Sequence, residues 1–191
     1  MMQVHLKNKK GYTLLELIVV IAIFSMVTSS LVMNYRGSTR AVLLNTLAHR
    51  IVSEFRQAQT YALGNVDKTS NFLPYGVFAS TNNTSSIIFF GDTSKNKKYE
   101  AGELVETLRF NTGNVITKLC VNMKKDGRDP SNCTSVTELH VTYTRPYPEP
   151  TIVPTPSVAG APYADAEIII STGTGITKTI VVWMTGQLAI E

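Results

Sequence analysis

Residues 12–35 read YTLLELIVVIAIFSMVTSSLVMNY, an apolar stretch interrupted by a single charge at Glu16. As a helix this stretch would be about 36 Å long, which is sufficient to cross the hydrocarbon core of a bilayer. The preceding residues, MMQVHLKNKKG, contain three lysines and no acidic residue. Because positively charged flanks stay in the cytoplasm, we predict a single-pass membrane protein whose C-terminal head lies outside the cytoplasm.

The apolar stretch differs from an ordinary secretory signal peptide, which has a shorter apolar region followed by a cleavage site of small residues. No convincing site of that kind follows Met33, so we expect the helix to remain in the mature protein. A carboxylate in a spanning helix costs roughly 2.5 to 3.5 kcal/mol at the bilayer centre and less near an end. Glu16 therefore needs a partner or a position at the membrane surface.

The segment KNKKGYTLLELIVVIAIF, residues 7–24, resembles the class III signal of type IV prepilins and pseudopilins. The shared features are a basic leader, Gly11, an aromatic residue at Tyr12, and a T-L-L-E sequence that ends at Glu16. The family usually has Phe where this chain has Tyr12. The resemblance implies that a prepilin peptidase cuts between Gly11 and Tyr12, and that the new amino group of Tyr12 is methylated.

The same resemblance implies a role for Glu16 in assembly. In the family this glutamate is thought to meet the N-terminal amine of a neighbouring subunit, so Glu16 would set the axial register of the filament. An ion pair that has lost its water in an apolar bundle discriminates against misplaced registers. The alternative is a signal anchor whose Glu16 lies at the level of the lipid headgroups, snorkelling or neutral.

The chain divides into four predicted segments, which are a leader peptide at 1–11, a transmembrane and assembly helix at 12–35, an amphipathic helix at 36–64, and a β-rich globular head at 65–191. The amphipathic segment places apolar residues at helical spacing from Leu44 to Ala62 and is expected to end near Gly64. Gly37 is its expected weak point, since a glycine costs about 1 kcal/mol in a helix interior.

The residues after 71 show the patterns of strands, separated by Gly, Asn, Asp or Pro. Strands are predicted at 75–80, 86–90, 104–111, 115–121, 137–144, 167–171, 178–184 and 187–190. Consecutive strands favour antiparallel pairing, so the predicted fold is α+β, with one long N-terminal helix packed on a mainly antiparallel sheet as in pilins. The proline-rich residues 146–156 are predicted to form an extended surface loop.

The C-terminal stretch TGTGITKTIVVWMTGQLAI, residues 172–190, reads as a late hairpin. Together with the long helix, this arrangement is similar to the minor pseudopilin H and FimT branch of the pilin-like proteins. The resemblance implies a minor subunit, while the sequence leaves a major pilin open as well.

The chain has two cysteines, Cys120 and Cys133, on either side of a polar loop with no histidine or third cysteine to complete a zinc site. If the head lies outside the cytoplasm, a disulfide is the favoured interpretation. Two free thiols in a reducing compartment are the alternative.

The segment DTSKNKKYEAGE, residues 92–103, places oxygen ligands at the spacing of a calcium loop. The candidate ligands are Asp92, Ser94, Asn96, the carbonyl of Lys98, Glu100 and Glu103. Two features argue against calcium, because Lys97 replaces the glycine of the sharp turn and three lysines raise the local positive charge. The flanking residues are also predicted to be strands rather than helices. The alternative is a solvated hairpin loop whose polar residues satisfy the turn.

The charge pattern gives no case for general nucleic-acid binding. The formal net charge is +4, with 18 basic and 14 acidic residues, and without the three leader lysines the count is 18 − 3 = 15 against 14. The remaining chain is therefore nearly neutral. His5, His49 and His140 fall in the leader, the helix and a predicted strand, and no nucleophile elbow accompanies them. An enzyme is not expected.

These features predict a structural subunit, a minor pilin or pseudopilin, of a type IV pilus or a type II secretion-like filament. The implied partners are a prepilin peptidase and methyltransferase, an assembly-platform membrane protein, and other pilin subunits that contact the N-terminal helix. The protein would start in the bacterial inner membrane and then join an extracellular or periplasmic filament.

Two alternatives come from other classes of protein. One is a membrane-anchored enzyme or solute-binding protein. The other is a DNA-binding minor pilin for DNA uptake, for which the candidate basic residues are Arg109, Lys118, Lys124, Lys125 and Arg128.

Overall fold

The computed structural model describes residues 11–64, 73–110, 113–123, 133–159, 161–173 and 175–191, and for residues 32–38 it describes the backbone alone. One helix precedes ten strands in this part of the chain. The chain separates into two compact units, Met1–Arg40 and Ala41–Glu191. The predicted membrane stretch lies in the first unit, and the strands lie in the second.

The helix α1 spans Leu14–Gly64 and contains no proline. It begins after Thr13, whose hydroxyl oxygen accepts a hydrogen bond of 3.3 Å from the backbone N–H of Glu16. A threonine in this position satisfies one of the donors that the first helical turn leaves unpaired. The backbone remains helical at Gly37, so the glycine that we expected to weaken the helix does not interrupt it.

In the second unit, α1 buries one face in the core of the head. The predicted apolar positions of this segment are all buried, namely Leu44, Leu47, Ile51, Phe55, Ala58 and Ala62. They form one core cluster with side chains from both sheets, among them Val77, Phe89 and Val141 from one sheet and Leu119 and Ile168 from the other. The spacing of apolar residues along the helix therefore predicted its buried face correctly.

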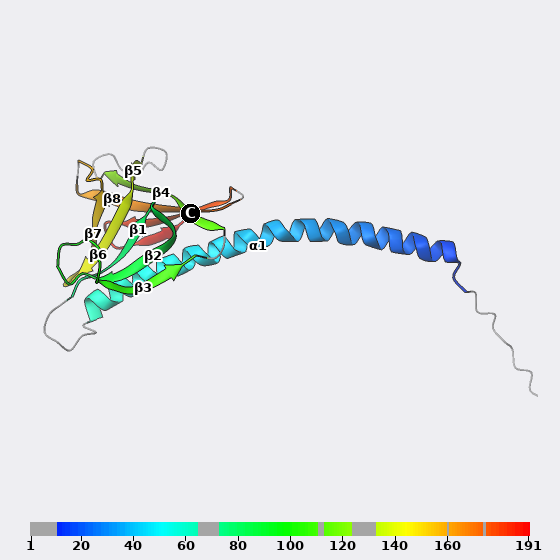
Figure 1. The fold of residues 1–191 in the computed structure, drawn as a ribbon, viewed down its shortest axis with the longest axis horizontal. Helices are drawn as coiled ribbons and strands as arrows, with labels where there is room; N and C mark the ends of the chain where they lie inside the picture. Colours follow the sequence, from blue (N-terminus) through cyan, green and yellow to red (C-terminus); the bar gives the residue numbers. More distant parts are fainter. Residues whose placement is uncertain (1–10, 65–72, 111–112, 124–132, 160, 174) are drawn as a thin grey trace, which may run out of the picture. The chain divides into compact units, whose positions relative to one another are not determined.

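The described strands form two five-stranded sheets (Figure 1). Sheet A has the order β3-β2-β1-β6-β7, with β1 Tyr75–Ser80, β2 Asn83–Gly91, β3 Leu104–Arg109, β6 Glu138–Thr144 and β7 Tyr147–Thr155. Sheet B has the order β10-β9-β8-β4-β5, with β4 Asn114–Met123, β5 Thr134–Val136, β8 Tyr163–Thr172, β9 Thr177–Trp183 and β10 Leu188–Ile190. All neighbouring strands pair antiparallel, which confirms the α+β class.

The structure corrects three details of the predicted head. The strands are divided between two sheets, because β4 pairs with β8 and β5 rather than with β3. The prediction of a surface loop at residues 146–156 is wrong, since most of this segment forms β7. Prolines are tolerated there because an edge strand needs hydrogen-bond donors on one side only. The short strand β5 was not predicted.

Candidate functional site

The bond between Gly11 and Tyr12 lies in an accessible position just before α1. Both residues are outside the helix, and the Tyr12 side chain is 87% exposed. A Cβ atom added at Gly11 would meet no atom within 4 Å, so nothing described crowds this bond. The rest of the predicted leader, residues 1–10, lies outside the described part of the chain.

Glu16 occupies the first turn of α1, and its side chain is exposed. The unpaired N–H groups at the start of a helix carry partial positive charge, so a carboxylate in this turn is stabilised. Removal of residues 1–11 would place a new amino group on Tyr12, at the same end of the helix as Glu16. The pairing of Glu16 with such an amine in a neighbouring subunit remains a prediction.

The helical segment Leu14–Leu31 is long and apolar enough to cross a membrane, and none of it is buried inside the chain. Three of its hydroxyl groups are satisfied within the helix, because Ser25, Thr28 and Ser29 each donate a hydrogen bond to the carbonyl four residues earlier. Internal hydrogen bonding of this kind lowers the cost of placing a hydroxyl in lipid. The segment therefore presents exposed apolar side chains, interrupted by the Glu16 carboxylate, and three of its hydroxyl groups are already paired.

The loop from Asp92 to Glu103 is organised by two buried carboxylates, the first of which is Asp92. One oxygen of Asp92 accepts hydrogen bonds from the hydroxyl of Ser94 at 3.2 Å and the backbone N–H of Asn96 at 3.0 Å. Its other oxygen accepts the backbone N–H of Lys97 at 2.8 Å. Lys97 has a φ of 66°, so it adopts the left-handed conformation that favours glycine. The loop thus turns around the Asp92 carboxylate.

Glu103 is the second buried carboxylate and closes the loop from its other end. Its oxygens accept backbone N–H groups of Ser94 at 2.9 Å and Glu100 at 3.0 Å, together with the hydroxyl of Thr93 at 3.0 Å. Burial by itself would raise the pKa of Glu103, but these hydrogen bonds outweigh it and hold the pKa below the ordinary carboxyl value. Glu103 is therefore ionised at neutral pH and held by donors of its own loop.

The structure brings most of the predicted calcium ligands together. Besides Asp92 and Glu103, the side chain of Asn96 donates a hydrogen bond to a carboxylate oxygen of Glu100 at 2.6 Å and accepts the N–H of Lys98 at 2.8 Å. The oxygens are those that a hard cation prefers. The same oxygens are already engaged by donors of the loop, so calcium binding remains a prediction from the spacing.

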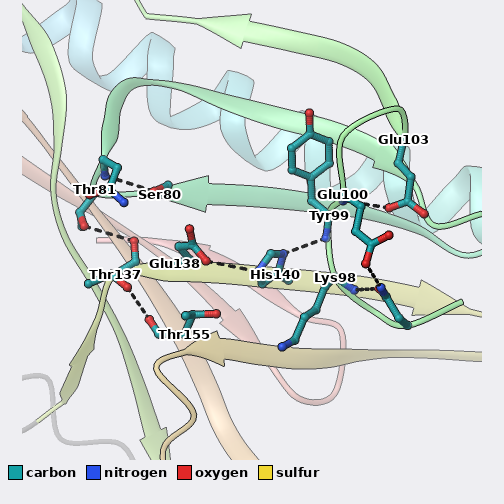
Figure 2. A network of polar contacts seen from close by, with 12 residues as sticks. Ser80, Thr81, Lys98, Tyr99, Glu100, Glu103, Thr137, Glu138, His140 and Thr155 are labelled. Atoms are coloured by element: carbon teal, nitrogen blue, oxygen red, sulfur yellow. Dashed lines mark hydrogen bonds and ion pairs between the residues drawn. The ribbon is translucent and has the colours of Figure 1, made fainter. Parts of the chain in front are cut away.

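The loop is joined to sheet A through His140, which lies on β6 (Figure 2). The backbone N–H of Tyr99 donates a hydrogen bond of 3.0 Å to Nδ1 of His140. Nε2 of His140 lies 4.0 Å from a carboxylate oxygen of Glu138. The His140 ring stacks on Phe78 with 4.8 Å between ring centroids, and Phe78 stacks on Tyr99 at 5.1 Å. The loop is therefore fixed to the sheet by one hydrogen bond and a group of rings.

Burial lowers the pKa of His140 to about 4, and the nearby charge of Lys98 acts in the same direction. The ring is neutral at pH 7, so Nδ1 is free to accept the Tyr99 N–H while Nε2 carries the proton. The sequence placed His140 correctly in a strand. It gave no sign of the partner, because Tyr99 is 41 residues away along the chain.

Cys120 and Cys133 form a disulfide with a Cα–Cα distance of 5.6 Å, as predicted. Cys120 lies on β4, and Cys133 immediately precedes β5. The carboxylate of Glu167 is near these sulfur atoms, but sulfurs joined in a disulfide cannot serve as thiolate ligands for a metal. Because the two sulfurs are bonded to each other, the alternative of two free thiols is wrong for this structure. On the same sheet, the amide of Asn122 donates to Asp165 at 2.8 Å and to Glu167 at 3.1 Å.

The candidate DNA-contacting residues are divided by the fold. Arg109 lies on β3 of sheet A and Lys118 on β4 of sheet B. Lys124, Lys125 and Arg128 lie outside the described residues. The described part of the head therefore places the two basic side chains that it includes on different sheets.

Comparison with known families gives one match, in which residues 6–32 fit the prokaryotic N-terminal methylation motif. The matched residues include Gly11, Tyr12, Glu16 and the apolar start of α1. No curated protein and no solved structure matches this chain. The match supports a type IV pilin-like protein that is processed as a prepilin, and it suggests membrane anchoring through the N-terminal helix.

Proposed function

We propose that this chain is a structural subunit of a type IV pilus or of a type II secretion-like filament, cut after Gly11 and methylated on Tyr12. The observation that carries the proposal is the methylation motif at residues 6–32. It coincides with an accessible Gly11–Tyr12 bond and with an apolar helix that the chain itself does not bury. A peptidase needs the first feature, and a filament core needs the second.

The N-terminal helix explains how such a subunit would stay in the membrane before assembly and pack in the filament afterwards. Its apolar surface is stable in lipid, and after extraction it is stable only against other apolar helices. Apolar contacts within a bundle of such helices favour no particular axial register. Glu16 would select one register, because a carboxylate buried without a cationic partner costs several kcal/mol. The Tyr12 amine of a neighbouring subunit offers that partner at one register only.

We place the protein among the minor subunits, on the pattern of a long helix followed by a late hairpin, here β9 and β10. The subunit starts in the bacterial inner membrane with its head outside the cytoplasm and is transferred to the filament by an assembly platform. A structural role accounts for the apolar stem and the stable head without a catalytic centre.

The decisive experiment is the intact mass and N-terminal sequence of the protein isolated from membranes. We expect the loss of residues 1–11 and the mass of one added methyl group on Tyr12. Gly11→Glu should block the cut, because a bulky charged side chain replaces a residue without one, while Gly11→Ala serves as the matched small substitution. If the chain keeps its initiator methionine in cells that assemble the filament, the proposal is contradicted.

A second experiment tests assembly separately from processing. Glu16→Ala should be cut normally and should remain in the membrane, while its amount in sheared filaments falls by at least about tenfold, the effect of roughly 1.4 kcal/mol. Glu16→Asp, which keeps the charge, should retain part of the incorporation. Normal incorporation of Glu16→Ala would remove the proposed role of the carboxylate.

A further inference from the structure

The two edges of sheet A differ in how they are protected. The edge strand β7 contains Pro148, Pro150 and Pro154, and proline blocks pairing because it has no N–H to donate. The other edge strand, β3, has the sequence LVETLR and contains neither proline nor glycine. Within the described residues, β3 pairs with β2 alone. One edge is thus closed by its sequence, and the other is open.

The backbone groups that β3 leaves open can be assigned from its pairing with β2. The N–H of Phe110 donates to the carbonyl of Ser85 at 2.8 Å, just beyond the end of β3. Because backbone groups of a strand alternate in direction, Leu108 and Glu106 also point to β2. Thr107 and Arg109 point away from it. The free edge therefore offers their N–H and carbonyl groups to an added strand.

Apolar side chains accompany this free edge. Leu104 and Val105, at the start of β3, are 51% and 52% exposed. The register between β2 and β3 shifts at this point, between Phe89 and Phe90. An added strand would cover apolar surface here as well as pairing backbone groups, and both effects favour binding.

Two carboxylates are relevant to this edge, Glu106 on β3 and Glu54 on α1. Glu106 is directly opposite Phe89, a core residue, so its side chain is on the helix side. The charge of Glu106 acts on Glu54 of α1, because burial and then this charge raise the pKa of the Glu54 carboxyl, while the charge of Arg50 offsets them only in part. One oxygen of Glu54 is buried and finds no hydrogen-bond partner in the described part of the chain. This buried oxygen of Glu54 lacks a donor.

We propose that the free edge of β3 binds an extended segment of a partner protein as an added strand, with a lysine or arginine of that segment placed at Glu54 and Glu106. The cation would supply the missing donor and relieve the repulsion between the two carboxylates. The backbone of Thr107 and Arg109 would give affinity, and the carboxylates would select a basic partner over an acidic one.

A second copy of this chain fits the edge less well. One antiparallel register of two β3 strands, paired through their free groups, is centred on Thr107. That register places the two Glu106 side chains on one face as diagonal neighbours, about 7 to 8 Å apart, with a Glu54 beside each. Four carboxylates would then gather without a new cation, which disfavours this pairing. In this register the charge on the helix side of the sheet disfavours self-association, whereas it attracts a basic strand.

The test uses the full chain in detergent micelles and two labelled peptides of alternating threonine and valine, alike except that one carries two lysines and the other two glutamates. Fluorescence anisotropy should show the lysine peptide binding at least about tenfold more tightly. Glu106→Gln should reduce that preference. Thr107→Pro should abolish binding, because it removes an outward N–H without touching the ladder to β2, whereas Thr107→Val should bind normally.

Hydrogen exchange gives a readout that does not depend on the proline variant folding. In the unaltered chain, the amides of Thr107 and Arg109 should exchange more slowly when the lysine peptide is added, while amides of β7 are unchanged. The proposal is overturned if the lysine peptide does not bind, if both peptides bind equally, or if folded Thr107→Pro binds as well as Thr107→Val. Concentration-dependent self-association that Thr107→Pro abolishes would also overturn it, in favour of a second copy.

Discussion

The backbone of Gly76 in β1 is packed tightly between the two strands beside it. A Cβ atom at this position would lie 2.6 Å from the carbonyl oxygen of Val141 and 2.9 Å from the ring of Phe90. Both contacts are too short, and β1 is the central strand of sheet A, so neither neighbour can move away without breaking pairs.

We predict that Gly76→Ala lowers the free energy of unfolding by about 1 to 3 kcal/mol. Gly173→Ala is the matched control, because its nearest atom would be 4.0 Å away, and it should change the free energy by no more than about 0.5 kcal/mol. Denaturant unfolding of the full chain in detergent, followed by the fluorescence of the single tryptophan, Trp183, measures both. Equal stabilities would show that β1 and its neighbours adapt to the added methyl group.

His140 makes the head sensitive to acid. Its pKa is lowered to about 4 in the folded state, against about 6.5 in an unfolded chain. The unfolded state therefore binds more protons between these values, and stability must fall as the pH drops from about 6.5 towards 4, by up to about 1.4 kcal/mol per unit. Glu138 lies 4.0 Å from Nε2 and favours the charged ring, but burial and Lys98 outweigh it.

We predict that His140→Asn flattens this part of the stability profile, since an amide oxygen can accept the Tyr99 N–H without titrating. Unfolding curves at several pH values between 4 and 7 measure the slope. The lowered pKa of Glu103 adds a separate loss at still lower pH, because its stabilisation is present above about 4.5 and disappears as the pH falls further. An unchanged slope in His140→Asn would assign the acid sensitivity to other groups.

At the scale of the element, the loop at residues 92–103 has two interpretations, a calcium-binding loop and a hairpin loop without metal, and experiments can distinguish them. Hydrogen bonds from its own backbone hold Asp92 and Glu103, so we predict that the head stays folded in EGTA. The calcium interpretation further predicts that added calcium raises the melting temperature and that Asp92→Asn removes the response, while Glu149→Gln on β7 keeps it. The hairpin-loop interpretation predicts no response to calcium in either variant.

The strands show which elements the sequence could predict. Runs of apolar and β-branched residues predicted β1 with its observed bounds and the other long strands except β7 to within about four residues, because such residues are buried in the core. The pattern fails at β7, whose prolines predict a loop. Pro150 lies opposite Tyr143 and Pro154 opposite Leu139, so the strand is specified by its partner β6 rather than by its own donors. Edge strands of this kind are difficult to predict from local sequence.

At the scale of the whole molecule, the N-terminal signal was predictable because all of its features lie in consecutive residues of the sequence. The division of the head into two sheets was not, since β4 follows β3 along the chain but pairs with β8 some 50 residues later. The loop contact between Tyr99 and His140 was hidden for the same reason. Contacts between distant segments depend on which strands become neighbours, and local patterns do not encode that choice.

The disulfide and the membrane topology are linked, because the bond between the two cysteines requires the head to lie outside the cytoplasm. Cys120 and Cys133 are separated by 13 residues, and closing a loop of about this size stabilises a fold by about 3 kcal/mol. The bond persists only where the surroundings are oxidising. If the lysines of the leader keep the N-terminus in the cytoplasm, the head lies outside and the cysteines are paired.

We therefore predict that a membrane-permeant alkylating reagent, added to intact cells before lysis, leaves both cysteines of the membrane-bound chain unmodified. After reduction of the denatured protein, mass spectrometry should find two added groups. The variant with both cysteines changed to serine should lose about 2 to 4 kcal/mol of unfolding free energy. Alkylation of both cysteines without reduction would contradict the disulfide and, with it, the inferred side of the membrane, because thiols stay reduced in the cytoplasm.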